Sequence, residues 1–403
     1  MRVLAVGSLY PPHHLGGYEV IWLGTTGHLA DRGHEVRTLA TTHREPGGEG
    51  LPDPHPDVHR ALRWYWSDYG FPALALRERL ALERHNHRVL EEHLSQFRPD
   101  VVMWWAMGGM SVSMVQAVAR RGIPAVGVVC DDWLDYGPRV DGWIAGWKRR
   151  RARPFAPLAE RITGIPTRFD ADHGVRWLFI SETTRRRARQ RGGWSVPDSA
   201  VCHSGIDPSR FPPAAPRPAW EGRLLYAGRL DPRKGITTAI DALADLPATT
   251  TLDLVGTGLP QDVAALRRQA EELGLGKRVR FRDQVAHDAL ADVYAGADVV
   301  LFPVSWEEPW GLVPIEAMSV GRPVVATGTG GSGEYLRDGV NCLRFPPKDA
   351  GALAAAVQRL AADPALRAQL RAGGAQTAAT YTQQAFDEQV AGHVEDVARR
   401  CGS

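Results

Sequence analysis

The chain has 403 residues, enough for two domains rather than one. Its 48 basic and 46 acidic residues leave a formal net charge of +2, which gives no general attraction to nucleic acid or to acidic lipid. The four cysteines lie far apart without the spacing of a metal site, so we expect reduced thiols in a cytoplasmic protein. We expect neither a secretory signal nor a membrane span, because apolar runs of the required length are missing.

The amino-terminal half alternates predicted strands with predicted helices. Residues 3–6 form an apolar strand, and a loop containing Gly16 and Gly17 leads into a helix over 18–31. Further strands are predicted at 36–40, 101–105, 125–129 and 177–180. Alternation of this kind is typical of a parallel sheet covered by helices.

A proline-rich stretch at 211–218 is the best linker candidate, since its four prolines forbid a helix or a central strand. A second α/β unit follows it. Its strands are predicted at 223–227, 251–255, 279–281, 299–302 and 323–326, and the tail from residue 350 is helical. We predict two Rossmann-like domains, 1–212 and 213–380. Facing sheets would leave a cleft at the carboxyl ends of their strands, where ligands bind in such folds.

Two acidic residues lie in the segment that follows the strand at 299–302. Pro314 suits the first turn of a helix, which places Glu316 near exposed amides that attract anions. Glu308 and Glu316 could each accept hydrogen bonds from paired hydroxyls, one pair on a sugar and the other on a ribose. The alternative is a solvated Glu308 and a Glu316 that only caps the helix.

Two basic residues follow the strand at 223–227. Arg229 offers a planar fork and Lys234 a compact charge, so both are candidates for binding a diphosphate. Gly228 allows close approach of the backbone. A plain surface turn is the alternative for this segment.

Glycine-rich turns follow three of the predicted strands. They contain Gly16 and Gly17, Gly256 and Gly258, and the run 328–333. Each could bind phosphate through backbone amides, and each is equally an ordinary turn. The P-loop pattern GxxxxGK[ST] does not occur.

Taken together, in this order and spacing, these segments resemble the family-four retaining glycosyltransferases of the GT-B fold. The matching residues are Gly16-Gly17, Gly205-Ile206-Asp207, Gly228-Arg229, Lys234-Gly235, Gly256, Gly258, 308–311, 316–318, 330–334 and 339–341. The likeness covers nearly the whole carboxyl-terminal half and is thin in the amino-terminal half. It implies a metal-independent, retaining hexosyltransferase that moves a sugar from a nucleotide diphosphate sugar to an acceptor hydroxyl.

The resemblance also implies roles for individual residues. Glu308 would hold hydroxyls of the donor sugar and Glu316 the ribose, while Arg229 and Lys234 would neutralise the diphosphate. Further donor contacts would come from Gly16, Gly17, Gly228, Gly256, Gly258, Trp310, Gly311 and Leu312, and contacts to the base from Gln284 and Val285. The helix at 381–403 would pack back on the first domain. No cofactor or metal is implied, since the nucleotide sugar is a substrate.

One position departs from the family pattern. Many members carry a His-Asp pair after an amino-terminal strand, whereas here Cys130 precedes Asp131 and Asp132. A thiol cannot replace imidazole as a hydrogen-bond donor and acceptor at neutral pH. Asp131 or Asp132 is therefore a candidate acceptor-side base, and a capping pair on a polar loop is the alternative.

The partners are predicted less sharply. We expect a nucleotide-sugar donor and an acceptor that is a small molecule, natural product or glycan, with no nucleic acid. The basic run at 148–153 faces an anionic acceptor, a membrane surface or simply solvent. The base, the sugar, the acceptor and the oligomeric state stay open. The alternatives to a transferase are a non-catalytic sugar-nucleotide-binding subunit and a GT-B epimerase.

Overall fold

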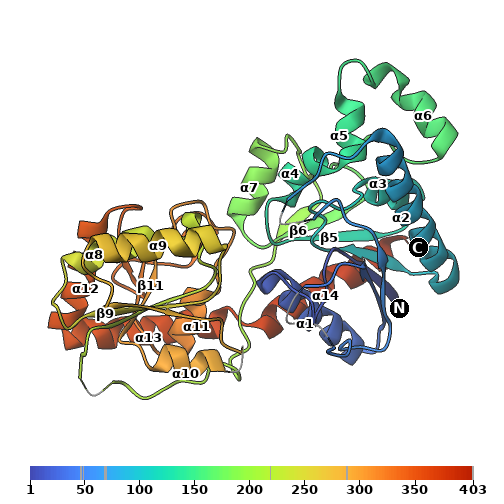
Figure 1. The fold of residues 1–403 in the computed structure, drawn as a ribbon. Helices are drawn as coiled ribbons and strands as arrows, with labels where there is room; N and C mark the ends of the chain where they lie inside the picture. Colours follow the sequence, from blue (N-terminus) through green and yellow to red (C-terminus); the bar gives the residue numbers. More distant parts are fainter. Residues whose placement is uncertain (46–47, 49, 68–69, 218, 287–288, 402–403) are drawn as a thin grey trace. The chain divides into compact units, whose positions relative to one another are not determined.

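The computed structural model describes residues 1–45, 48, 50–67, 70–217, 219–286 and 289–401. The chain divides into two compact units, one of residues 1–203 together with the segment from Phe386, and one of residues 204–385. Each unit contains one parallel sheet with helices on both faces (Figure 1). Pro218 of the predicted linker and the last two residues of the predicted C-terminal helix lie outside the described residues.

The first unit is built on a seven-stranded sheet in the order β3-β2-β1-β4-β5-β6-β7. Its strands are β1 (Arg2–Val6), β2 (Glu35–Thr41), β3 (Val58–Leu62), β4 (Val101–Trp104), β5 (Ala125–Val129), β6 (Arg176–Phe179) and β7 (Ser199–Val201). Every residue of β4, β5 and β6 is buried. Helices cover both faces of the sheet, so these strands are almost entirely apolar rather than alternating, and Arg176 at the start of β6 is the exception among them.

Two groups of helices cover this sheet. On one face lie α1 (Gly17–Asp31) and α14 (Gln383–Cys401), and on the other α2 (Leu76–Phe97), α3 (Ser113–Arg120), α4 (Trp133–Val140) and α7 (Glu182–Gln190) (Figure 1). Helix α14 is held on this unit by Phe386, Val390 and Val394, all fully buried or nearly so. Its Asp396 also pairs with Arg176 of β6 at 2.6 Å.

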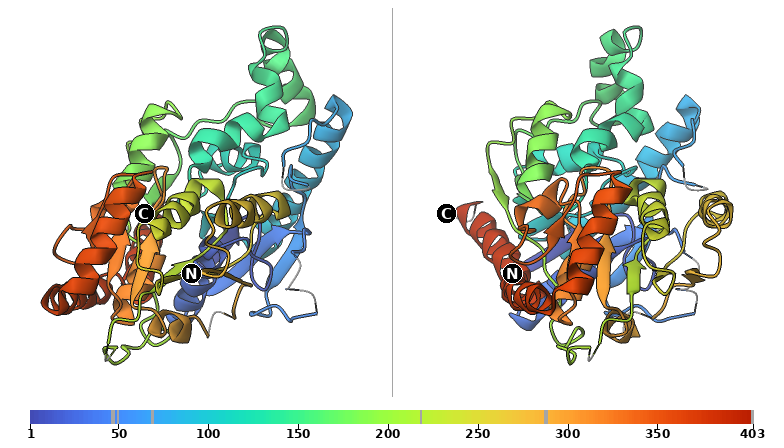
Figure 2. Two further views of the ribbon diagram at one scale, coloured as in Figure 1. Left: turned by 60° about the vertical axis from the view of Figure 1, so that its left-hand side comes forward. Right: turned by 90° about the vertical axis from the view of Figure 1, so that its left-hand side faces the viewer.

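A short helical arm follows α4. It spans residues 141–168 and contains α5 (Gly142–Lys148), the 3-10 turn η1 (Arg153–Phe155) and α6 (Ala156–Thr163). In all three views of Figures 1 and 2 the arm extends away from the other helices of its unit. Asp141 anchors its base, because its buried carboxylate accepts hydrogen bonds from the amides of Trp143 and Ile144 and from that of Val112.

The second unit contains a six-stranded parallel sheet in the order β10-β9-β8-β11-β12-β13. Its strands are β8 (Arg223–Ala227), β9 (Thr251–Val255), β10 (Val279–Arg282), β11 (Val299–Phe302), β12 (Val324–Ala326) and β13 (Leu343–Arg344). Helices α8 (Ile236–Ala244), α9 (Pro260–Glu272) and α12 (Ala350–Ala362) cover one face, and α10 (Leu290–Ala295), α11 (Val313–Ser319) and α13 (Pro364–Thr380) the other (Figure 1).

Both sheets reverse their strand order at a central pair of strands. The pair is β1 and β4 in the first sheet and β8 and β11 in the second. The loops that leave such a pair run in opposite directions and open a crevice at the carboxyl edge, where ligands bind in sheets of this type. Lys234 follows β8 and Glu308 follows β11. The topology of the second sheet therefore brings these two residues to the same edge.

The structure confirms the predicted α/β class and adds three strands that the sequence pattern did not indicate. These are β3, β7 and β13, each of which lies at the edge of its sheet. Edge strands bury less surface and carry more polar residues, as in the Val-His-Arg-Ala-Leu sequence of β3. They therefore lack the apolar run that identified the central strands.

Gly235, at the start of α8, supplies a test of the packing around Lys234. Its φ is +71°, and a Cβ there would lie 1.9 Å from the carbonyl oxygen of Pro303. Gly339 has nearly the same φ, +70°, but open space around it. We expect Gly339→Ala to lower the unfolding free energy by about 1–2 kcal/mol, from backbone strain alone. Gly235→Ala adds the clash and should cost roughly 3 kcal/mol or more.

Urea unfolding of the two variants checks this comparison. Equal losses of stability in Gly235→Ala and Gly339→Ala would show that the contact between Gly235 and Pro303 does not constrain the loop.

Candidate functional site

Lys234 and Glu308 form an ion pair at the carboxyl edge of the second sheet. The Lys234 ammonium lies 2.8 Å from Oε2 of Glu308, and the indole N–H of Trp306 donates to the same oxygen, also at 2.8 Å. The two side chains are only 17% and 11% exposed. Low exposure weakens screening by solvent, so this pair is stronger than an ordinary surface salt bridge.

Arg233, the residue before Lys234, pairs with a carboxylate of its own turn. The Asp231 carboxylate accepts the backbone N–H of Arg233 at 2.9 Å and pairs with the guanidinium of the same residue at 2.7 Å. Hydrogen bonding to Arg233 is the main cause that lowers the pKa of Asp231 to about 2. The Arg233 guanidinium also stacks over Trp306, 4.7 Å from the ring centroid. The positive charge of Arg233 is thus offset by the Asp231 carboxylate of the same turn.

Arg229 differs from both of these residues. It is exposed at the end of β8, and no carboxylate among the described residues pairs with its guanidinium. Its backbone carbonyl accepts the hydroxyl of buried Tyr226 at 2.6 Å, which fixes the main chain while the side chain extends into solvent. Arg229 therefore keeps its full donor capacity at the same edge of the sheet as Lys234.

Glu308 is held by the glycine-rich turn that follows β12. Its carbonyl accepts the N–H of Gly331 at 2.7 Å. At Gly330, φ is +65°, and a Cβ would lie 2.4 Å from the carbonyl oxygen of Glu308. The turn at 328–333 thus positions Glu308, and packing is a sufficient reason for the glycine at 330.

Glu316 lies in the first turn of α11 and is buried. The hydroxyl of Tyr294 donates to its Oε2 at 2.6 Å. Burial is the largest cause of the raised pKa of Glu316, while Tyr294 and the charge of Arg210 act in the opposite direction. A buried carboxyl with one engaged oxygen is suited to a further hydrogen-bond donor.

Three of the predicted donor-contact residues lie between Glu308 and Glu316. The ring of Trp310 is buried, and its N–H donates to the carbonyl of Ser204 at 2.9 Å. It packs against Tyr335 and Tyr381, with ring centroids 4.9 and 5.2 Å away. Gly311 has φ of +88°, and Leu312 directly precedes α11. The Trp310 side chain therefore anchors this segment, which leaves only its backbone for ligand contact.

The glycines after β8 and β9 bring two loops together. A Cβ on Gly256 would lie 2.0 Å from the carbonyl oxygen of Gly228, and one on Gly258 would lie 2.3 Å from that of Leu230. Close packing of backbone on backbone thus requires glycine at both positions. Gln284 and Val285 follow β10, the strand next to β9, and the Gly256 amide donates to the carbonyl of Arg282 at the end of β10 at 3.1 Å.

In the first unit, Asp131 follows β5 at the carboxyl edge. The hydroxyl of Tyr136 donates to its Oδ2 at 2.8 Å, and the N–H of Trp133 donates to Oδ1 at 3.1 Å. Desolvation is the largest cause of its raised pKa. The neighbouring Asp132 pairs with Arg187, yet burial still raises the pKa of Asp132 to about 6.

Cys130 precedes this pair and is buried. Burial, with a further contribution from the charge of Asp131, raises the pKa of its thiol well above the ordinary value. The thiol therefore stays neutral and does not supply the charge-switching chemistry of an imidazole.

The start of α1 contains a residue that the sequence analysis did not select. Glu19 is buried, and its Oε2 accepts the backbone N–H of Gly16 at 3.2 Å. The Gly16 amide is thus already engaged within the helix start, whereas Gly17, the first residue of the helix, has no intrahelical acceptor for its amide. An acidic residue three positions after the helix cap is the signal that could have identified Glu19.

The part of the chain that the structure describes contains neither a metal cluster nor a membrane span. In those residues no group of three or more His, Cys, Asp or Glu side chains is placed to hold a metal ion. None of the helices in the same ranges has the length and apolar content needed to cross a membrane.

Comparison with known proteins identifies the family. The model for glycosyl transferases group 1 matches residues 212–377, and the model for glycosyltransferase family 4 matches residues 15–210. The glycogen synthase of Mycobacterium tuberculosis is 30% identical over 430 aligned positions, which cover 96% of this chain and 94% of that protein. The chain belongs to the family-four glycosyltransferases.

Solved structures show the same fold for this glycosyltransferase. Sucrose-phosphate synthase from Thermosynechococcus elongatus superimposes with a TM-score of 0.73 at 23% identity, over 98% of both chains. Anabaena HepE, crystallised in complex with UDP-glucose, gives 0.71 at 22% identity, over 98% of this chain and 100% of its own. These neighbours confirm the predicted GT-B fold, and the family confirms the predicted glycosyltransferase activity. The roles of individual site residues stay predictions.

The buried Glu19 predicts a pH dependence of stability. Desolvation is the main cause that raises the pKa of this carboxyl from 4.5 to about 7. The folded state therefore binds the proton more tightly than the unfolded state between these two values. The contribution of the protonated Glu19 carboxyl to the unfolding free energy is therefore fully present below pH 4.5. It is lost as the pH rises through about 7. Relative to Glu19→Gln, the wild-type unfolding free energy should fall by roughly 3 kcal/mol over that interval.

Urea unfolding of both proteins at several pH values measures this difference. The Gln variant retains an oxygen that can accept the Gly16 amide, so it serves as the uncharged reference. Parallel pH profiles for the two proteins would contradict the assignment.

Proposed function

We propose that this glycosyltransferase moves a hexosyl group from a nucleotide diphosphate sugar to an acceptor hydroxyl, with the donor bound by the second unit. The observation that carries the proposal is the 2.8 Å pair between Lys234 and Glu308, assembled from two loops at the strand reversal. A cation and a carboxylate side by side match the two charged halves of such a donor. A diphosphate needs positive charge, and sugar hydroxyls need an acceptor.

The distribution of donors and acceptors supports separate roles for the charged residues. An ammonium group has three N–H donors, and Glu308 takes one from Lys234, so the others are available to phosphate oxygens. Arg229 adds a planar fork for the same diphosphate. Oε2 of Glu308 already has two donors, which leaves Oε1 for hydroxyls of the sugar.

The nucleoside would contact the other predicted residues. Glu316 would accept the ribose hydroxyls, since Tyr294 occupies only one of its oxygens. Gln284 and Val285 would contact the base, and the backbone at Gly228, Gly256, Gly258, Gly311 and Leu312 the phosphates and sugar. The complex of Anabaena HepE with UDP-glucose supports a uridine nucleotide as the first donor to test.

The chemical step is proposed to proceed with retention and without a metal or cofactor. The bond from the anomeric carbon to the phosphate oxygen breaks, and its electron pair leaves with the diphosphate. The acceptor oxygen bonds to the anomeric carbon on the same face, and its proton passes to the departing phosphate oxygen. Lys234 and Arg229 stabilise the negative charge that develops on the leaving group, which is where such stabilisation accelerates the reaction.

The acceptor is proposed to bind the first unit, at the edge that carries Asp131. Tyr136 donates to Asp131, and its ring lies 6.4 Å from that of Phe71. The ring of Phe71 packs edge-on against that of Trp66, with centroids 5.0 Å apart, and Trp66 stacks on Trp64, with centroids 5.4 Å apart. Aromatic faces beside a hydrogen-bond acceptor suit a small molecule with a flat or sugar ring.

We also propose a cytoplasmic location, which the free thiols of Cys130, Cys202 and Cys342 support.

Two substitutions test the donor site. Lys234→Met removes the cation near the leaving group, and Glu308→Gln removes the charge that pairs with it. Each should lower kcat for transfer from UDP-glucose by about a hundredfold, equivalent to ~3 kcal/mol in the barrier. Lys277→Met, at an exposed lysine of the same unit, is the matched control and should leave the rate unchanged.

Near-normal turnover in Lys234→Met or Glu308→Gln would contradict the assignment. UDP release that requires an acceptor identifies a transferase. UDP release without any acceptor would favour the epimerase, and tight UDP binding without turnover across a panel of acceptors would favour the non-catalytic subunit.

The stereochemical proposal has its own test. An α-linked donor such as UDP-glucose should give an α-linked product, and the rate should be the same with and without EDTA. Proton NMR coupling constants of the newly formed linkage report its configuration. A β-linked product, or a rate that EDTA abolishes and Mg²⁺ restores, would refute this part of the mechanism.

A further inference from the structure

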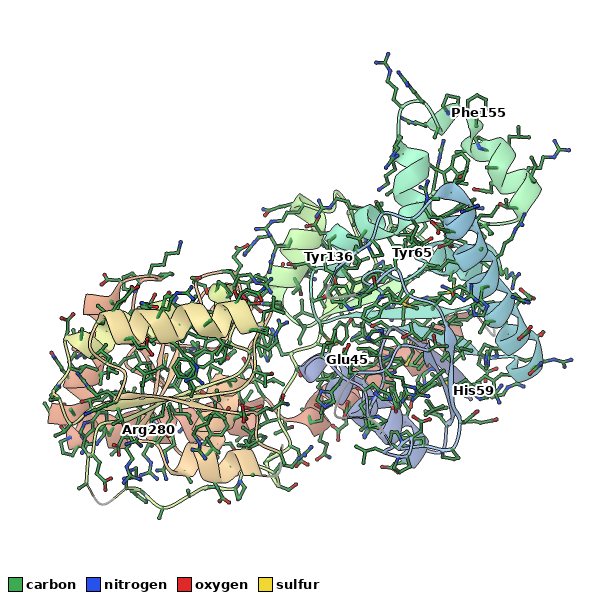
Figure 3. The ribbon with its side chains drawn as sticks, in the orientation of Figure 1. Glu45, His59, Tyr65, Tyr136, Phe155 and Arg280 are labelled. Carbon is green, nitrogen blue, oxygen red and sulfur yellow. The ribbon has the colours of Figure 1, made fainter. Side chains whose placement is uncertain are left out.

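The helical arm of the first unit exposes an apolar stripe. Phe155, Leu158 and Ile162 are 62%, 57% and 71% exposed. They are spaced three and four residues apart, so they lie on one side of α6 and the turn before it. Ile162 and Phe155 are the two most exposed large apolar side chains in the part of the chain that the structure describes. Figure 3 shows Phe155 near the end of the arm.

The same arm carries a concentration of positive charge. Its exposed basic residues are the run Lys148–Arg151 together with Arg153, Arg161 and Arg168. Its two acidic residues do not offset them, because Asp141 is buried and Glu160 pairs with Arg120. The arm is therefore strongly basic although the chain as a whole is close to neutral.

Four of these basic residues surround one depression in the surface of the arm. The depression, of about 500 Å³, is lined by Lys148, Arg150, Arg153, Pro154, Pro157 and Arg168. Pro154 and Pro157 directly precede Phe155 and Leu158 of the apolar stripe in the chain. Several cations around one concave surface suit a phosphate group, because guanidinium and ammonium groups both bind phosphate oxygens.

Neither a solvated face nor a soluble polyanion explains both features together. A solvated basic helix has no need for three exposed apolar side chains in one row, and isolated exposed apolar residues do not line up in this way. A soluble polyanion would be bound by the charges alone. An anionic lipid surface uses both, since acyl chains accept apolar side chains and headgroup phosphates attract the cations beside them.

We propose that the arm at 141–168 docks this glycosyltransferase on an anionic phospholipid surface, with Phe155, Leu158 and Ile162 inserted between headgroups and the surrounding cations bound to phosphate. The contact is peripheral, because the stripe spans only two turns of helix. The arm lies apart from the donor loops in the chain, so docking does not depend on the roles assigned to Lys234 and Glu308.

Vesicle flotation of the full chain tests the proposal. Vesicles of phosphatidylcholine alone are compared with vesicles of equal parts phosphatidylcholine and phosphatidylglycerol. The chain should float with the anionic vesicles, and high salt should weaken binding because it screens the charges. Replacing Phe155, Leu158 and Ile162 by Ser should lower partitioning at least tenfold, and replacing Arg149, Arg150 and Arg151 by Gln should do the same.

Matched control variants carry the same changes elsewhere on the surface. Leu76, Leu259 and Leu273 are also exposed and are replaced by Ser, while Arg268, Lys277 and Lys348 are replaced by Gln. Both controls should bind vesicles like the wild type, and circular dichroism checks that every variant is folded.

Several results would overturn the proposal. One is equal flotation with neutral and anionic vesicles, and another is unchanged binding when the three apolar residues of the arm are replaced. Failure to float combined with binding to polyphosphate would assign the arm to a soluble polyanion instead of a membrane.

Discussion

The contact between Lys234 and Glu308 is the constraint on which the proposed donor site depends. The two residues are 74 positions apart, and they meet because β8 and β11 are neighbours at the point where the sheet reverses its strand order. A partly buried pair is stable only if further hydrogen bonds compensate for lost hydration. Trp306 supplies one of these, and the Gly330 turn holds the Glu308 backbone. The site is thus assembled by sheet topology and then fixed by local packing.

The central strands and the family could be predicted from sequence because their signals are local. Apolar runs such as 101–104 and 299–302 are buried on both sides. The glycines and charges that resemble the family lie mainly in the carboxyl-terminal half. The partner of each charge could not be predicted, since it depends on contacts between distant loops. Arg229, Arg233 and Lys234 look alike in the sequence. In the structure Arg233 pairs with Asp231 and Lys234 with Glu308, while Arg229 extends into solvent.

The first unit shows how burial changes residues whose sequence context is ambiguous. Glu19 reads as a surface residue of a helix start, yet it is buried and its pKa is raised to about 7. The charge of Asp131 adds to the raised pKa of Glu19, although burial contributes more, and the Cys130 thiol stays neutral because burial raises its pKa. The cysteine therefore removes a cation that a protonated histidine would have brought to this edge. Hydrogen bonds from Tyr136 and Trp133 partly compensate at Asp131.

The two units distribute their charges for different purposes. In the second unit Arg233 and Lys234 pair with Asp231 and Glu308, and each pairing sets the orientation of the basic side chain before any ligand is considered. In the arm of the first unit the cations crowd together without offsetting carboxylates, next to apolar side chains that no other part of the unit covers. Paired charges recognise a ligand of defined shape, whereas crowded unpaired charges recognise a surface of opposite charge whatever its detailed structure. This contrast is the physical reason for assigning a specific nucleotide sugar to the one and a lipid surface to the other.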